Sequence, residues 1–137
     1  MVETFQTFSR CGVRYLLISG QATVLYGAAE FSEDLDLWVD PRQENLDRVL
    51  NALGQLQARV GALTPPLTEA NARCGHGFHF IVTESEGQRW PVDILGQPPR
   101  VGEFEESYDE AVSSVPALPE LKSIDCFRLV ARKKTDR

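Results

Sequence analysis

The run DLDLWV constrains the fold of this chain most, because it sets two acids one residue apart inside an apolar segment. If the run is a strand, Leu35, Leu37 and Val39 share one face, which can enter a core. Asp34 and Asp36 then stand side by side on the opposite face. Like charges in that position repel each other and are costly to desolvate. We therefore expect something to hold them, and a divalent cation is the first candidate.

The flanking sequence alternates between helical and extended patterns. We expect a helix over residues 2–10, a strand over 14–18, a short helix over 21–26, a strand over 34–39, and a helix that Pro41 opens and that carries the apolar stripe Leu46, Val49, Leu50 and Leu53. A loop over 61–69 then precedes a hairpin of strands 78–83 and 89–95, a helix over 104–112 and a last helix capped by Ser123.

This order of elements predicts a single α/β (α+β) domain over residues 1–137, with a small mixed β-sheet covered on one face by helices. The first two strands are joined through a helix, which is compatible with parallel pairing, and the hairpin would add antiparallel edges. The chain has 137 residues, of which 42% are hydrophobic and 25% charged, so it is long enough and apolar enough for one proper core.

Charge and cysteine usage narrow the setting of the protein. The formal net charge is -6, which removes the usual electrostatic drive for nucleic-acid binding, and the only dense basic stretch is ARKKTDR. Cys11, Cys74 and Cys126 are far apart and odd in number, as in a protein with reduced thiols. The sequence shows neither a membrane span nor a secretory signal, so we expect a cytoplasmic location and no membrane partner.

A third acid, Asp93, lies within WPVDIL in the second strand of the predicted hairpin. If that strand lies beside the strand of Asp34 and Asp36, three carboxylates converge. Such a cluster suits Mg²⁺, which prefers carboxylates together with substrate phosphates. Two such ions can stabilise the attacking and the leaving oxygen in a displacement at phosphorus.

Upstream of the acids, Ser19 and Gly20 interrupt the sequence between a strand and a helix. A helix that starts at such a break offers free backbone N–H groups to a phosphate. Gly20 also lets the backbone approach an anion closely. The combination of this turn with the acids is typical of a site for phosphate and metal.

These residues resemble a known family. The run LLISGQATVLYG, followed by AAEFSEDLDLWVD, is similar to the opening of nucleotidyltransferase-fold proteins of the AbiEii and MNT-like kind, in the polymerase-beta superfamily. The VDIL around Asp93 matches the later strand that carries their third acid. The tail LKSIDCFRLVARKKTDR resembles the basic helix that follows their core.

The resemblance implies Mg²⁺-dependent transfer of a nucleoside monophosphate from a nucleoside triphosphate to a hydroxyl on RNA or protein. By this resemblance, Asp34, Asp36 and Asp93 are the catalytic, metal-binding residues, and Asp93 also helps to activate the acceptor. Nucleotide-binding roles fall to Ser19, Gly20, Lys133 and Lys134. Related proteins often act in toxin–antitoxin or defence systems, so a cognate toxin or antitoxin protein is an expected partner.

Two alternatives stay open at this stage. Ser19 replaces a glycine that is usual in such relatives, and Glu30 stands where many of them carry arginine, which favours a catalytically inactive binding or antitoxin module of the same fold. A structural metal-binding domain without chemistry is the other alternative.

Histidines and tryptophans near the acids are expected to be structural. His76 and His79 could join Cys74 as metal ligands, but no fourth ligand is evident, so we expect them to be structural or exposed. We expect Trp38 and Trp90 to pack in the core.

Overall fold

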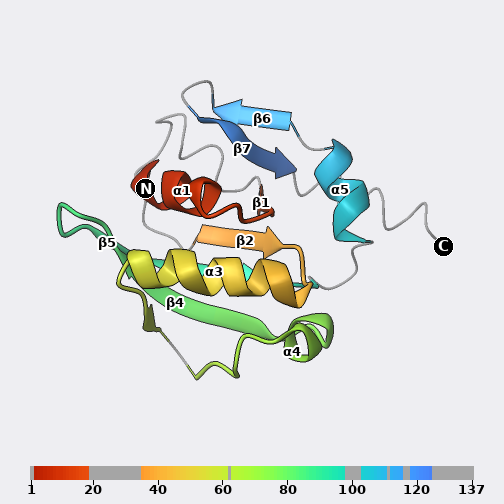
Figure 1. The fold of residues 1–137 in the computed structure, drawn as a ribbon, viewed down its shortest axis with the longest axis horizontal. Coiled ribbons are helices and arrows are strands. Elements are labelled where there is room, and N and C mark those ends of the chain that lie inside the picture. The colour runs from red at the N-terminus through yellow and green to blue at the C-terminus, as the bar shows by residue number, and fades with distance from the viewer. Residues whose placement is uncertain are drawn as a thin grey trace.

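The computed structural model describes residues 2–18, 35–61, 63–97, 103–110, 112–115 and 118–124 (Figure 1). The helices of this part are α1 (Val2–Arg10), α3 (Gln43–Gln55), α4 (Glu69–Arg73) and α5 (Phe104–Glu110). The strands are β1 (Tyr15–Ile18), β2 (Leu35–Val39), β3 (Arg59–Val60), β4 (Gly77–Thr83), β5 (Arg89–Leu95), β6 (Val112–Val115) and β7 (Leu118–Ile124). The protein therefore has an α+β fold, as its sequence predicts.

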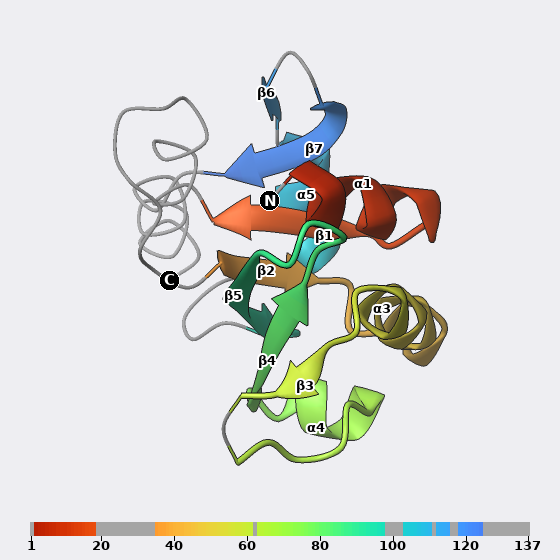
Figure 2. The same cartoon turned by 90° about the vertical axis from the view of Figure 1, so that its left-hand side faces the viewer.

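The strands of the described part form one mixed sheet in the order β3-β4-β5-β2-β1-β7-β6 (Figures 1 and 2). β2 pairs with β5 and β1 pairs with β7 in parallel, and the other neighbours are antiparallel. The expectation of a parallel β1–β2 pair is wrong, since Leu17 pairs antiparallel with Leu37. The parallel partner of β2 is β5, which is linked to it by residues 40–88. Such a long excursion through α3 is the kind of crossover that parallel pairing needs.

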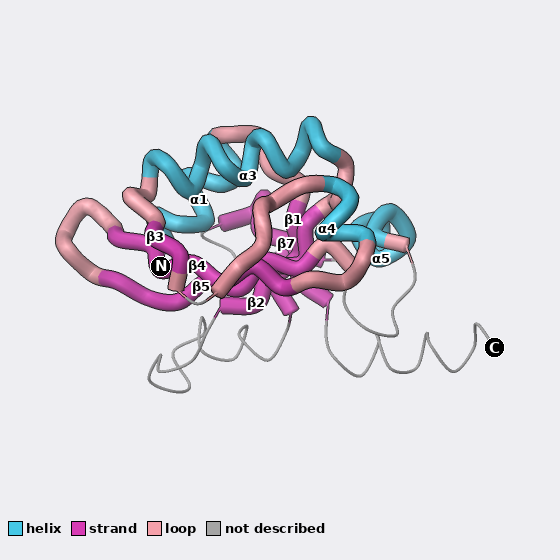
Figure 3. The backbone as a smooth tube through the Cα atoms, turned by 90° about the horizontal axis from the view of Figure 1, so that it is seen from below, coloured by secondary structure: helices cyan, strands magenta, loops and turns pink. Residues whose placement is uncertain are grey.

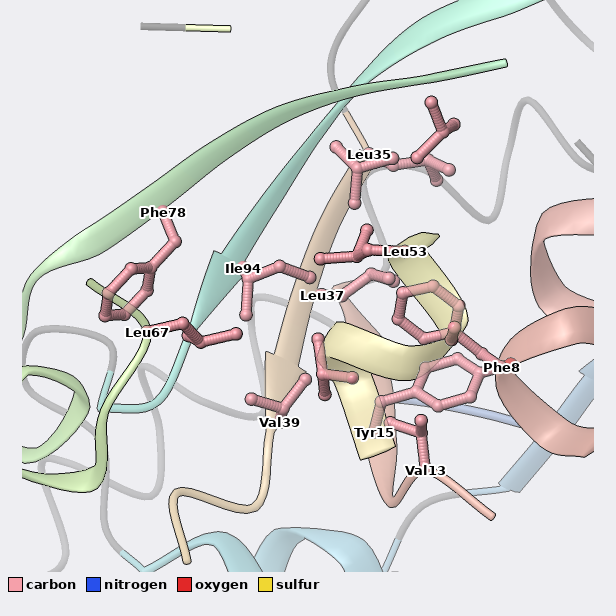
Figure 4. Close-up of a cluster of buried hydrophobic side chains, with 14 of the residues drawn as sticks. Phe8, Val13, Tyr15, Leu35, Leu37, Val39, Leu53, Leu67, Phe78 and Ile94 are labelled. Atoms are coloured by element: carbon pink, nitrogen blue, oxygen red, sulfur yellow. The ribbon is translucent and has the colours of Figure 1, made fainter. Parts of the chain in front are cut away.

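Helices α1 and α3 lie on one face of the sheet (Figure 3). Alternate strand residues point into this layer, where Leu37 and Ile94 meet Phe8 of α1 and Leu53 of α3 (Figure 4). Each of these side chains is at most 3% exposed. Full burial of one such side chain is worth about 1.5–3 kcal/mol, so this layer is the main source of hydrophobic stability.

The apolar stripe of α3 differs in one position from its prediction. Leu46 and Val49 are fully buried, but Leu50 is 45% exposed. Leu53 is buried as predicted, and Ala52 takes the place of Leu50 in the buried stripe. Leu50 lies at the margin of the stripe, where a helix that rests on a flat sheet turns its side chains back toward solvent.

A smaller apolar cluster lies on the opposite face of the sheet. Leu16 and Trp38 alternate along their strands with the core residues and pack against Phe104 of α5. The Trp38 and Phe104 rings meet edge to face at 5.6 Å, and Trp38 Nε1 donates to the carbonyl of Gly96 at 3.2 Å. The predicted core role of Trp38 is therefore confirmed. The expectation that helices cover only one face is wrong, because α5 packs on the other.

Other departures from the predicted elements are local. Ser123 lies in β7, so it does not cap a helix there, because residues 118–124 complete the sheet beside β1. Strand β3 and helix α4 are unpredicted; Thr68 caps α4 by accepting a hydrogen bond from the Asn71 N–H. Helix α5 ends at Glu110, two residues early, and α3 begins at Gln43 rather than Pro41. The helix expected over 21–26 lies outside the described residues.

None of the helices in the described part has the length and apolar character that a membrane crossing would require.

Candidate functional site

Asp36 and Asp93 are direct neighbours across two parallel strands. In the ladder between β2 and β5, Asp36 pairs with Asp93, between the pairs Leu35 with Val92 and Leu37 with Ile94. Residues that pair across a ladder point to the same face of a sheet, and neighbouring strands are about 4.8 Å apart. The two carboxylates thus share one stretch of the sheet, as the sequence analysis requires.

The apolar residues on either side of these acids fix the face on which they stand. Leu35, Leu37, Val92 and Ile94 are all fully buried in the layer of α1 and α3. A slip of one residue in either strand would move those side chains out of the core and push an acid into it. The hydrophobic core therefore holds the acids on the opposite face.

The end of β1, the start of β2 and the end of β7 lie at the same end of the sheet. β1 is antiparallel to β2, so it ends at Ile18 beside the start of β2. β7 is parallel to β1 and ends level with it, since Ile18 pairs with Ile124. Ser19 and Gly20 follow Ile18 in the chain, Asp34 precedes Leu35, and the segment with Lys133 and Lys134 follows Ile124. Those five residues lie outside the described residues.

His79 is a member of the site that the sequence analysis did not place there. It pairs with Asp93 across the β4–β5 hairpin, and its Nδ1 lies 2.7 Å from Asp93 Oδ1. A carboxylate can only accept a hydrogen bond, so Nδ1 must carry the proton and donate it. Asp36, Asp93 and His79 therefore form a row across β2, β5 and β4, which lie side by side in Figure 2. We call these three residues the acid row.

The backbone explains why the imidazole reaches the carboxylate. The His79 N–H donates to Thr64 Oγ1 at 3.0 Å, and its carbonyl accepts from the Gly61 N–H at 2.8 Å. Both backbone groups of His79 thus face away from β5. Its pairing with Asp93 is then of the non-hydrogen-bonded type, in which the two Cα atoms approach to about 4.5 Å and the side chains are closest.

A signal for this contact was present in the sequence. With residues 84–88 as the turn, Thr83 faces Arg89, and counting back along both strands places His79 opposite Asp93. The prediction for the histidines depended on the spacing of Cys74, His76 and His79 along the chain. It did not use the register of the two strands across the hairpin. His76, by contrast, is exposed in the loop before β4.

The acids fit Mg²⁺ in chemistry and in number. Mg²⁺ is commonly held by one or two carboxylates plus water and substrate phosphate, and Asp36 and Asp93 supply two such groups. Asp93 is only 18% exposed, and among the described residues its Oδ2 has no hydrogen-bond partner. In the same ranges, no three His, Cys, Asp or Glu side chains are grouped as a metal site.

A second charged cluster joins the far end of β2 to α5. Asp40, with a side chain only 4% exposed, accepts from Arg14 Nη1 at 3.0 Å and from Arg42 Nη2 at 2.6 Å. Burial alone would raise the pKa of Asp40, but the hydrogen bonds from Arg42 and the charges of both arginines outweigh it and hold the pKa below its ordinary value. Arg14 also binds both oxygens of Glu105 and lies over the Tyr108 ring. These charges satisfy one another, so the cluster is an anchor for α5.

Two hollows in the described surface are lined by residues outside the acid row. One of 410 Å³ lies between α1 and the β4–β5 turn, where Glu84 is bound to Thr4 and Arg10 to Gln55. Another of 160 Å³ adjoins Asp40 and Arg42. The charged groups named here already have protein partners.

Comparison of the chain with protein-family models, with curated proteins and with solved structures found no match. The case for a function therefore depends on the geometry of the acid row.

Proposed function

We propose that this protein is a Mg²⁺-dependent nucleotidyltransferase, which moves a nucleoside monophosphate from a nucleoside triphosphate to a hydroxyl on RNA or protein. The observation that carries the proposal is the register of β2 against β5, which sets Asp36 beside Asp93. Asp34, the third acid of the proposal, lies outside the described residues.

The two acids have a physical reason to bind a cation. Two carboxylates on adjacent strands repel each other, and a cation shared between Asp36 and Asp93 would relieve this repulsion. Mg²⁺ bound there would supply positive charge to the triphosphate and to the charge that develops at the α-phosphorus. Asp36 and Asp93 hold that charge in place on rigid strands rather than on loops.

The residues of the chain divide the transfer reaction among them. The acceptor hydroxyl attacks the α-phosphorus, a new P–O bond forms, and the bond to the β-phosphate oxygen breaks to release pyrophosphate. Asp93 helps to take up the proton that the hydroxyl loses. Ser19 and Gly20 bind the triphosphate through backbone N–H groups, and Lys133 or Lys134 contacts phosphate.

The topology supports this division of roles. The chain enters the segment of Ser19 and Gly20 from Ile18, and it enters the segment of the lysines from Ile124. Both points lie at the end of the sheet where β2 begins, next to Asp36. The strands that lead into the two predicted anion-binding segments thus end beside the start of β2, which carries Asp36. A role in a toxin–antitoxin or defence system is part of the same proposal and stems from the resemblance of the sequence.

The proposal is tested in two steps with the full chain. Calorimetry first measures binding of a nucleoside triphosphate with and without Mg²⁺. Transfer of an α-phosphate label to RNA or protein is then followed in a lysate and on the purified acceptor. We expect Mg²⁺-dependent binding, and we expect Asp36→Asn and Asp93→Asn each to lower transfer by about a hundredfold or more, which corresponds to about 3 kcal/mol.

Asp47→Asn is the matched control, since Asp47 is an exposed acid on α3. Transfer that survives both site variants, or that falls equally in Asp47→Asn, contradicts the proposal. Binding of a partner protein without any affinity for nucleotide selects the inactive module instead. A metal that raises the melting temperature without any effect on nucleotide binding selects a structural metal domain.

A further inference from the structure

The contact between His79 and Asp93 goes beyond what the proposed function requires. Asp93 is the middle residue of the acid row. Asp36 lies next to it on β2 and His79 lies next to it on β4. Among the described residues, the side chain of Asp93 has its hydrogen bond on the β4 side, with His79. The question is what this bond does to the carboxylate between its two neighbours.

A free aspartate carboxylate turns easily, because the torsion next to it is broad and two-fold. The bond from Nδ1 removes this freedom by holding Oδ1 toward β4 at 2.7 Å. Oδ2 of Asp93 is then left on the side of Asp36. Among the described residues, this Oδ2 has no hydrogen-bond partner. The histidine thus divides the two oxygens of Asp93 between two neighbours.

The imidazole is itself held in place. Its backbone is bonded on the outer side of β4, to Thr64 and to Gly61. Its ring extends along β4 over Gly77, where an added Cβ would lie 3.5 Å from both Cε1 and Nε2. That distance is ordinary van der Waals contact, so the ring lies close to the backbone of Gly77. Among the described residues, Nε2 has no hydrogen-bond partner, so the bond to Asp93 is the polar contact that orients the ring.

We propose that His79 is a positioning residue of the nucleotidyltransferase site: its Nδ1–H fixes one oxygen of Asp93 so that the other is presented to the cation shared with Asp36. This inference rests on the proposed function. It adds a residue that acts through Asp93 and that touches neither metal nor substrate. Partners that orient a metal-binding group in this way typically change metal affinity by 10–100-fold when they are removed.

The first test is spectroscopic and needs no metal. The chain has two histidines, so its imidazole ¹H–¹⁵N correlation spectrum holds two ring systems, and His76→Gln assigns them. At a pH where free imidazole is neutral, we expect His79 to carry a proton on Nδ1. A His79 ring that is protonated on Nε2 alone overturns the inference.

The second test measures the affinity of the full-length protein for Mg²⁺ alone by calorimetry. His79→Gln carries no donor at the Nδ1 position and is expected to weaken Mg²⁺ binding by about tenfold or more. His79→Asn places an amide N–H close to the position of Nδ1 and is expected to restore most of that loss. His76→Gln, in the exposed loop, is the matched control and keeps the native affinity.

The outcomes separate this inference from the proposed function. If Asp36→Asn abolishes Mg²⁺ binding while His79→Gln binds like the native protein, the site stands and the role of His79 is wrong. Equal losses in His79→Gln and His79→Asn also overturn it, because the donor at Nδ1 is then not what matters. If the native protein binds no Mg²⁺ with or without nucleotide, both the function and the inference fall.

Discussion

At the scale of single residues, Gly96 shows how closely the layers approach at the end of β5. A Cβ on Gly96 would lie 2.5 Å from the Cβ of Ala72 in α4. Its carbonyl also accepts the hydrogen bond from the buried Trp38 ring. The residue is thus a point of contact between α4, β5 and the smaller apolar cluster.

Gly96→Ala is therefore expected to lower the free energy of unfolding by about 1–3 kcal/mol, because α4 must shift to admit one methyl group. Gly54→Ala is the matched control: nothing lies within 4 Å of its added Cβ, and it sits within the exposed side of α3. That variant is expected to be more stable by about 0.5–1 kcal/mol. Urea unfolding followed by tryptophan fluorescence measures both, and changes of the same sign would contradict the packing at Ala72.

Individual residues also show what the sequence can and cannot predict about the site. The alternation of leucine and aspartate fixes the face of Asp36, and the same pattern around Asp93 fixes its face. Neither pattern says that β2 and β5 are neighbours, because pairing between distant strands depends on the whole fold. The contact between His79 and Asp93 could be predicted from the register of the hairpin. The spacing of residues within CGHGFHF instead favoured Cys74 and His76 as the neighbours of His79.

At the scale of elements, α1 is fastened to the turn of the β4–β5 hairpin. Glu84, 6% exposed, accepts hydrogen bonds from both the N–H and the hydroxyl of Thr4, at 2.8 and 2.7 Å. The N–H of Thr4 is one of the first donors of α1, which lack partners within the helix. In return, Glu3 accepts from the Ser85 N–H at 2.7 Å. A carboxylate from a distant turn thus serves as the helix cap.

Glu84→Ala is expected to lower the free energy of unfolding by about 1–3 kcal/mol, because it leaves two buried donors of Thr4 without this acceptor. Glu86→Ala, at an exposed position of the same turn, should change it by no more than about 0.5 kcal/mol. Denaturant titration of both variants measures the difference. Similar stabilities for the two variants would show that the hydrogen bonds between Glu84 and Thr4 do not stabilise the attachment of α1.

The anchor of α5 predicts how stability depends on pH. The pKa of Asp40 is lower in the folded protein than in the unfolded chain, where it is about 4. The stabilisation from its ion pairs is therefore fully present above about pH 4 and is lost as the pH falls through the folded value. Asp40→Asn should be less stable than the native protein at pH 7, and the gap should narrow below pH 4.

Urea unfolding at pH 7, 5, 4 and 3 measures this gap, with Asp47→Asn as the exposed control. A gap that stays constant over this range would mean that the charge of Asp40 does not contribute. The arginines of this cluster remain charged throughout, so within the cluster only the carboxylates titrate.

Elements with strong local patterns could be predicted, and those that depend on partners could not. Helix α1 and the hairpin of β4 and β5 were expected where they occur, because periodicity and a polar turn mark them. The segment of β7 contains Pro119 and two charged residues, Glu120 and Lys122, and it lacks clean alternation. It forms a strand because β1 and β6 pair with it on either side. Pairing of this kind is not visible in local sequence.

At the scale of the whole molecule, the proposed site lies at one end of the sheet, and the packing that stabilises the fold lies on its two faces. In the described part, the layer of α1 and α3 holds the larger buried cluster, some of which Figure 4 shows, and Arg14 binds Glu105 of α5 on the opposite face. The acid row lies on the face of the sheet opposite α1 and α3. Its member Asp36 is near the start of β2, at the end of the sheet where β1 and β7 end. The mixed strand directions make this possible, since an antiparallel neighbour ends where its partner starts.

The most direct test of the central claim is a crystal of the protein soaked with Mn²⁺, as a substitute for Mg²⁺, and a non-hydrolysable nucleoside triphosphate. The account predicts an anomalous peak between Asp36 and Asp93, about 2.1 Å from a carboxylate oxygen of each, with the phosphates on its open side. A metal bound elsewhere, or nucleotide bound away from this pair, would contradict the account.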